Sequence, residues 1–315
     1  MVKSFVFIGN TDVGEILSKR LLEDGFEIAA SPEEADAALV FCDSQSDLEN
    51  VFFDSAGLIQ ISRPGTYLVN LSAATPNFSK ELNAVALVSD LHPIEAPLFV
   101  KNPMLEHAFS DKNNLSCFVS GEAEDIEQLR ALFEALCAEH RITASAGSAQ
   151  LSHAALTILR SSQLLAGMET EALFRAFSQA SDAAILAAYE WGVVKEQGIR
   201  LHSAIKNEEF TSEYSAAMWM ADLTAALTTA DDYELILPGA EACLHLLELL
   251  GVIGGASMSS AALSLIYSEE ALCAKHGLDW TKAEDAYTEE IQDFHEDCGH
   301  EHDDFADGFG SYSAN

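Results

Sequence analysis

The chain changes character near residue 147. Before that point short apolar runs alternate with helical segments, and beyond it only helical patterns occur. The first run, Ser4–Ile8, ends at Gly9, and apolar residues at helical spacing follow over Val13–Leu22. Further short runs occupy Phe26–Ala30, Ala37–Phe41, Tyr67–Leu71, Ala86–Ser89 and Leu115–Val119. This alternation predicts a parallel sheet with helical crossovers.

One crossover in this predicted sheet is too short to hold a helix. Between the second and third runs lie only the residues Ser31–Asp36. A helical connection between parallel strands usually takes a dozen residues or more. We therefore expect one helix to be missing here, whereas Glu124–Ala138 reads as an amphipathic helix.

The second half of the chain is rich in alanine and leucine at helical spacing. The periodic segments are Leu151–Val194, Ser212–Ala230 and Gly239–Leu250. A chain of 315 residues is long enough for two domains. We expect an α/β nucleotide-binding domain over residues 1–146, an all-helical domain over 147–283 and an acidic flexible tail over 284–315.

The charge balance excludes several classes of partner. The chain has 51 acidic and 16 basic residues and a net charge of −35, which repels nucleic-acid phosphates and anionic membrane surfaces. No apolar stretch approaches the length of a membrane helix, and the N-terminus does not resemble a signal peptide, so we expect a cytoplasmic protein. Six cysteines without CxxC spacing indicate free thiols.

The acidic tail contains a group of potential metal ligands. Three histidines and a cysteine lie there among several carboxylates, namely His295, Cys298, His300 and His302. These ligand types suit a borderline metal such as zinc or nickel. Their spacing is not that of a fixed tetrahedral site, so a solvated tail is the other interpretation.

The turn after the first strand sits where a dinucleotide fingerprint G-x-G-x-x-G belongs. Its residues are Gly9, Asn10, Thr11, Asp12, Val13 and Gly14. Thr11 replaces the central glycine, and a simple strand-to-helix turn is the alternative. Ser31, after the second strand, has a hydroxyl for a 2′-phosphate but no neighbouring arginine, so NAD and NADP stay equally open. Cys42 and Asp43 follow the third strand and complete the predicted cofactor site.

Several segments in order resemble the β-hydroxyacid dehydrogenase superfamily, in particular the 3-hydroxyisobutyrate and 6-phosphogluconate dehydrogenases. Residues 67–76 (YLVNLSAATP) resemble the D-x-S-T-x-x-P stretch, and residues 114–121 (NLSCFVSG) resemble the N-L-T-x-x-V-G-G strand. The segment Phe210–Pro238 resembles the F-x-x-x-L-x-x-K-D-L helix and its following turn. The resemblance implies a Rossmann domain followed by an all-α domain, and a nicotinamide cofactor bordered by Ser72 and Thr75.

The resemblance also implies catalytic positions. The motif G-x-G-x-x-x-K-x-x-x-N aligns with residues from Gly147, which places His153 where the family has its lysine and Thr157 where it has asparagine. Residues four apart share a helix face, and an imidazole can exchange protons near neutral pH. His153 is therefore expected as the proton donor, with Thr157 and Asp222 near it; a histidine satisfied in the domain interface is the other interpretation. Ala221 replaces the second family lysine.

The expected substrate site is altered. The segment Glu95–Lys101 (EAPLFVK) takes the place of the family loop D-A-P-V-S-G-G, which assigns Glu95 and Lys101 to the substrate. His92, in an L-H-P segment like that of prephenate dehydrogenases, is expected at the carboxyl end of a strand, and a loop histidine that caps local backbone is the alternative.

Two functions of different classes remain open from the sequence. The first is an NAD(P)-dependent oxidoreductase that acts on a small hydroxy acid, carbonyl or imine. The second is a catalytically inactive scaffold for binding or assembly, in which side chains such as Thr11 and Phe99 would fill the cofactor groove. The resemblance further implies a homodimer formed through the helical domain.

Overall fold

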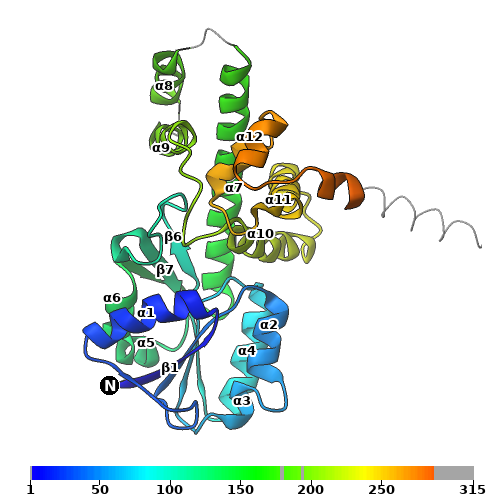
Figure 1. The fold of residues 1–315 in the computed structure, drawn as a ribbon. Coiled ribbons are helices and arrows are strands. Elements are labelled where there is room, and N and C mark those ends of the chain that lie inside the picture. Colours follow the sequence, from blue (N-terminus) through cyan, green and yellow to red (C-terminus); the bar gives the residue numbers. More distant parts are fainter. Residues whose placement is uncertain (1, 178–180, 193–194, 287–315) are drawn as a thin grey trace, which may run out of the picture.

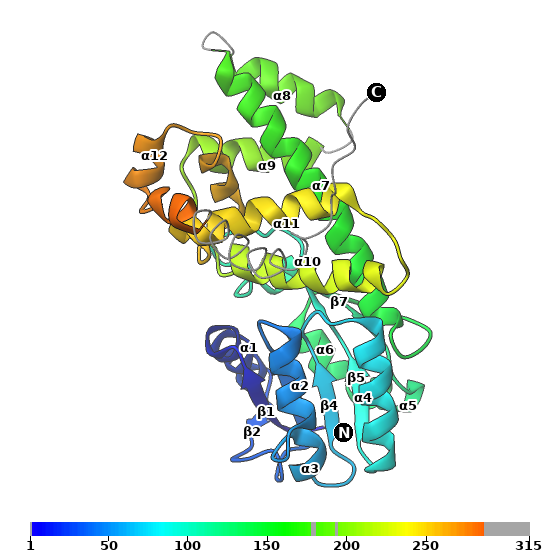
Figure 2. The ribbon, with the colours of Figure 1, turned by 90° about the vertical axis from the view of Figure 1, so that its right-hand side faces the viewer.

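A computed structural model describes residues 2–177, 181–192 and 195–286 of the chain. Its first part is a three-layer α/β unit, and its second part consists of helices that stand on the carboxyl-end side of the sheet (Figures 1 and 2). The apolar pattern of the sequence predicted an α/β region followed by helices, and this prediction is confirmed.

The main sheet has five parallel strands in the order β2-β1-β3-β4-β5. Their bounds are β1 Ser4–Gly9, β2 Glu27–Ile28, β3 Ala37–Phe41, β4 Tyr67–Asn70 and β5 His92–Glu95. Every residue of β3 is buried, as expected for the central strand of a sheet that is covered on both faces. The residues between β2 and β3 form turns without a helix, as the short spacing predicted.

Helices cover both faces of this sheet (Figure 1). One side carries α1 Thr11–Glu23, α5 Ala123–Gln128 and α6 Arg130–Leu136, and the other carries α2 Gln45–Phe53, α3 Leu58–Ile61 and α4 Pro76–Val88. Each layer has its own apolar core: Phe5 and Leu17 belong to the first, and Phe52 and Phe78 to the second.

The expected strand over Ala86–Ser89 is wrong. These residues form the last turn of α4 and its C-cap, and the next strand, β5, begins at His92. A second sheet then follows, with β6 Leu98–Val100, β7 Leu115–Val119 and β8 Glu139–Ile142 in the order β6-β7-β8. A bridge between Glu95 and Ser120 joins the two sheets.

The helical part is organised around one long helix, α7 Ser148–Ala176. The others are α8 Asp182–Trp191, α9 Lys195–Lys206, α10 Ala216–Asp231, α11 Pro238–Leu250 and α12 Glu270–Lys275, with short helical turns at Gly251–Gly255 and Ser260–Leu265. Helices α10 and α11 pack against α7, and α10 lies nearest the α/β part (Figure 2). None of the helices in the described ranges has the length and apolar character needed to cross a membrane.

The start of α7 is tied to the end of β5. Gly147 has a positive φ of 86°, and its amide donates to Oε1 of Glu95 at 2.5 Å. The other oxygen of Glu95 accepts from the amide of Gln150 at 3.3 Å. A carboxylate at a helix N-terminus is stabilised by free amides and by the helix dipole. Glu95, expected to bind substrate, is therefore engaged with the backbone of the long helix.

Candidate functional site

The glycine turn holds the end of β1 against β3. Gly9 has φ of 112°, and a Cβ there would lie 2.1 Å from the carbonyl oxygen of Phe41. Asn10 caps α1, because its side-chain oxygen accepts from the amide of Val13 at 3.0 Å. Its amide group also donates to both carboxylate oxygens of Asp43, at 2.9 and 3.1 Å. The turn thus presents the start of α1 at the carboxyl edge of the sheet, where dinucleotide phosphates bind in such folds.

A cavity of about 380 Å³ lies beside this turn, between the ends of the strands and α10. Cys42 and Asp43 line it from the α/β side, and Asp222 lines it from α10. The structure therefore brings together three residues that the sequence singled out. Residues 9–14 do not line this cavity; they are connected to it through the Asn10–Asp43 hydrogen bonds.

Ser72 and Thr75 are buried and serve the backbone. The hydroxyl of Ser72 accepts from the amide of Cys42 at 2.8 Å, and that of Thr75 caps α4 by accepting from the amide of Phe78 at 3.2 Å. Gln150 of α7, which the sequence analysis missed, accepts from the amide of Ala74 and donates to the carbonyl of Ser72, both at 2.9 Å. These bonds fix the loop after β4 to the long helix.

Asp222, His153 and Tyr214 form a buried polar cluster where α7 meets α10. The hydroxyl of Tyr214 donates to Oδ2 of Asp222 at 2.6 Å. Nε2 of His153 lies 3.7 Å from the same oxygen, too far for a hydrogen bond, and has no other partner in the described chain. Thr157, one turn further along α7, is also buried. Of the three residues predicted to lie together, His153 and Asp222 approach to 3.7 Å across the two helices.

Burial sets the protonation of this cluster. Burial raises the pKa of Asp222 to about 6, although the hydrogen bond from Tyr214 and the charge of Arg160 act to lower it. Burial, together with the charge of Arg160, lowers the pKa of His153 to about 3. Near neutral pH the imidazole is therefore uncharged, and the carboxyl group is the member that titrates close to the physiological range.

Phe99 and Arg160 are neighbours of this cluster, and the sequence analysis assigned neither of them to catalysis. The ring of Phe99 packs edge-on against His153 with centroids 6.1 Å apart. The guanidinium carbon of Arg160 lies over the same Phe99 ring, 3.9 Å from its centroid. Phe99 therefore fills space beside His153, while Thr11 is exposed at the start of α1 and fills no groove.

The expectation for His92 is wrong. It is the first residue of β5 and pairs in register with Tyr67, the first residue of β4, so it lies at the amino edge of the sheet. Its Nδ1 is 2.9 Å from Oδ2 of Asp125, and its ring stacks on that of Tyr67. Ligands of open parallel sheets bind at the opposite edge, so His92 is remote from the cavity at Asp222.

Other predicted residues are scattered. Ser31 hydrogen-bonds the carboxylate of Glu33, which lowers the pKa of Glu33. Lys101 lines a different cavity, together with Arg160, and its amine donates to the carbonyl of Asn113 at 3.1 Å. The candidate metal ligands His295, Cys298, His300 and His302 lie outside the described residues. Among the described residues no group of three or more metal-ligating side chains gathers.

The first half of the chain matches a known type of domain. Residues 10–147 match the NAD binding domain of 6-phosphogluconate dehydrogenase. This region is similar to an NAD-binding domain of that type. The domain explains why the glycine turn, β3 and the loop after β4 converge on one edge of the sheet.

Two curated proteins are similar to parts of this chain. It is 23% identical over 174 residues to the uncharacterized oxidoreductase YkwC of Bacillus subtilis, covering 48% of this chain and 59% of that protein. It is 28% identical over 102 residues to an NAD-dependent L-serine dehydrogenase of Pseudomonas aeruginosa, covering 32% of this chain and 33% of that protein. The chain thus matches less than two thirds of the length of each of these curated relatives.

A solved structure extends the likeness to the helical part. The 3-hydroxyisobutyrate dehydrogenase of Mycobacterium tuberculosis, solved with L-serine, superposes with a TM-score of 0.70 at 15% identity. The match covers 85% of this chain and all (100%) of that chain. The fold of a Rossmann domain followed by helices is confirmed, and over residues 10–147 the resemblance to 6-phosphogluconate dehydrogenase is borne out.

Proposed function

We propose that this protein is a nicotinamide-dependent oxidoreductase acting on a small substrate with a hydroxyl, carbonyl or imine group. The observation that carries the proposal is the carboxyl group of Asp222, which lines the cavity at the carboxyl edge of the sheet and has its pKa raised to about 6. A bound nicotinamide supplies or accepts the hydride, so the chain itself has to move a proton.

Asp222 is the group we assign to that proton. Its Oδ2 is held by the hydroxyl of Tyr214, so the carboxyl group has a fixed orientation. A carboxyl group with a pKa near 6 can give and take protons under physiological conditions. His153, which is uncharged because its pKa is about 3, lies behind this carboxyl group with Nε2 3.7 Å from Oδ2, and it does not line the cavity. Thr157, one turn further along α7, is buried as well.

The chain's residues fit a dinucleotide and favour NAD over NADP. The first amides of α1 lie at the carboxyl edge of the sheet, where they can hold a diphosphate. Glu33 and Glu34 follow Ser31 with no base beside them, and carboxylates at this place bind a ribose 2′-hydroxyl but repel a 2′-phosphate. We therefore infer a preference for NAD.

Turnover with NADH and a panel of 2-oxo acids, ketones and imines tests the assignment of Asp222. In the reducing direction Asp222 must be protonated, so the rate is expected to fall as the pH rises above about 6. In the oxidising direction the carboxylate is the base, and the rate should instead rise through the same pH. A rate that is flat between pH 5 and pH 8, with binding and stability unchanged, would contradict the role of Asp222.

A second candidate is a scaffold that has lost catalysis. The observation in its favour is the carboxylate of Asp43, which is hydrogen-bonded to Asn10 at the start of α1 and opposes a diphosphate there. An Asp43→Asn variant should bind NADH about five- to tenfold more tightly if the carboxylate opposes binding in this way. Dinucleotide binding without turnover of any substrate in the panel would favour the scaffold.

We also propose that the chain divides at Gly147 and forms a homodimer through its helices. The positive φ of Gly147 immediately before α7 suits a domain junction. The helical part exposes large apolar side chains, among them Leu173 (61% exposed), Trp191 (92%) and Ile236 (81%). Contact between two copies through this part of the chain would remove such side chains from water. A monomer mass by light scattering at micromolar concentration would refute the dimer.

A further inference from the structure

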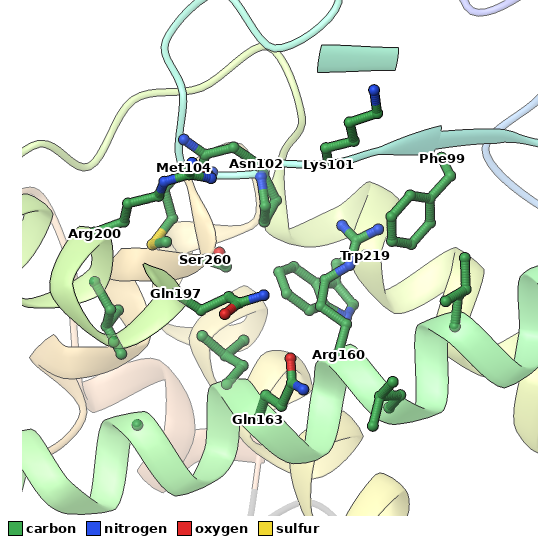
Figure 3. Close-up of a pocket in the computed structure, with 17 residues that line it drawn as sticks. Phe99, Lys101, Asn102, Met104, Arg160, Gln163, Gln197, Arg200, Trp219 and Ser260 are labelled. Carbon is green, nitrogen blue, oxygen red and sulfur yellow. Dashed lines mark hydrogen bonds between the residues drawn. The ribbon is translucent and has the colours of Figure 1, made fainter. Parts of the chain in front are cut away.

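A second cavity, of about 340 Å³, is lined in part by Phe99. Its lining is positively charged, which is unusual for this acidic protein. It lies between α7, α9, the segment after β6 and Trp219 of α10 (Figure 3). Its lining contains three basic residues and no acidic residue, namely Lys101, Arg160 and Arg200. The whole chain has only 16 bases against 51 acids. A positive pocket in so acidic a molecule selects for an anion.

Arg160 is the least exposed of these three bases: it is half-buried, whereas Lys101 and Arg200 are exposed. Its guanidinium lies 3.9 Å from the ring centroid of Phe99 and 5.0 Å from that of Trp219, and Figure 3 shows it beside both rings. Its Nε and Nη1 have no hydrogen-bond partner among the described residues. Burial lowers the pKa of Arg160, but a guanidinium stays charged in proteins.

The nearest acids do not neutralise Arg160. Asp222 and Tyr214 act on it through space and favour its charged form, yet no carboxylate oxygen of the described chain lies within 4.0 Å of it. Arg200 has an ion-pair partner at 3.8 Å in the exposed Glu196, and the amine of Lys101 bonds to a backbone carbonyl. A partly buried guanidinium without an ion-pair partner among the described residues is costly, so Arg160 is the charge in this cavity that an anionic ligand would offset. The enclosed Nε and Nη1 leave Nη2 as the nitrogen through which such a ligand would bind.

The rest of the lining defines the body of that ligand. Its walls are mainly apolar side chains from four elements, including Met104, Leu156, Leu164, Leu201 and Trp219. Gln163 of α7 and Gln197 of α9 add two amides that face the cavity (Figure 3). The volume is in the range that holds small organic ligands.

We propose that this cavity binds a small monocarboxylate with an apolar body, whose carboxylate pairs with Arg160 and whose body packs against Leu164, Leu201 and Trp219. Planar, charge-assisted pairing of a guanidinium with a carboxylate supplies both affinity and orientation. The site is separate from the nucleotide cavity at Asp43, and its occupation does not require turnover.

Titration calorimetry with hexanoate, hexan-1-ol and hexylamine tests this site on the full chain without cofactor. Hexanoate is expected to bind at submillimolar concentration and to raise the melting temperature, while the neutral and cationic analogues bind at least tenfold more weakly. Equal binding of hexan-1-ol would show an apolar cavity with no anion site. Failure of millimolar hexanoate to bind would equally overturn the proposal.

Variants separate the roles of charge and volume. Arg160→Met should weaken hexanoate at least tenfold and raise the melting temperature of the unliganded protein, because it removes an unpaired buried charge. Arg130→Met, which removes an exposed arginine paired with Glu127, is the matched control and should change neither. Gln163→Trp should fill the cavity and abolish hexanoate binding with Arg160 intact. Unchanged hexanoate affinity in Arg160→Met or Gln163→Trp would place the anion elsewhere.

Discussion

Replacing Asp222 by asparagine is expected to lower turnover by roughly 10²- to 10⁴-fold, the range that a positioned general acid or base contributes. Asparagine keeps the size of the side chain and can still accept the hydrogen bond that Tyr214 donates at 2.6 Å. It cannot exchange a proton. The loss should therefore appear in kcat, and the pH dependence near 6 should disappear.

The control for this variant is Asp231→Asn, an exposed acid at the end of the same helix α10. It changes the net charge by the same amount, so it accounts for any long-range electrostatic effect. Steady-state rates from pH 5 to pH 8 compare the two variants. An Asp222→Asn protein that retains its rate, or retains the transition near pH 6, would exclude Asp222 as the proton-transfer group.

Replacing His153 by glutamine is expected to change how stability depends on pH. The pKa of His153 is lowered from 6.5 to about 3 in the folded state, so its favourable contribution is complete above 6.5 and is lost as the pH falls below that value. At pH 4 the loss amounts to roughly 3 kcal/mol, because each pKa unit is worth about 1.4 kcal/mol. Relative to the wild type, His153→Gln should gain this amount between pH 7 and pH 4.

Asp222 acts in the opposite direction over nearly the same range. Its pKa is raised from 3.8 to about 6, so its contribution is complete below 3.8 and is lost as the pH rises through 6. The two effects partly cancel in the wild type, and Asp222→Asn should lose roughly 2 kcal/mol relative to it on acidification from pH 7 to pH 4. Urea unfolding at both pH values measures these differences. Parallel pH dependence of the wild type and the His153 variant would show that His153 is not buried uncharged.

The sequence predicted the bounds of two strands correctly. Strands β3 and β7 begin and end at the predicted residues, Ala37–Phe41 and Leu115–Val119, because their apolar runs are bounded by polar residues. The prediction of a strand over Ala86–Ser89 was wrong because this run is the end of a helix. The buried residues Leu82 and Ala86 follow the helical period, whereas Val88 is 88% exposed. A short apolar run alone does not separate a strand from a helix end.

The site could be predicted only in part, because packing rather than order along the chain assembles it. The family-like motifs led to His153 and Asp222, which the helices α7 and α10 bring to 3.7 Å. Tyr214 gave no local signal, since its role depends on the bond to Asp222. Arg160 had one signal: it lies seven residues after His153, on the same helix face, in a chain with few bases.

Titration of the purified protein with NADH and NADPH tests the central claim most directly. Binding is measured by the fluorescence of the ligand and by the melting temperature of the protein. Binding to the folded state must raise its stability by mass action. We predict micromolar binding of NADH, weaker binding of NADPH because of Glu33 and Glu34, and a higher melting temperature with either. No binding of either dinucleotide at millimolar concentration would contradict the proposed oxidoreductase and leave the scaffold as its function.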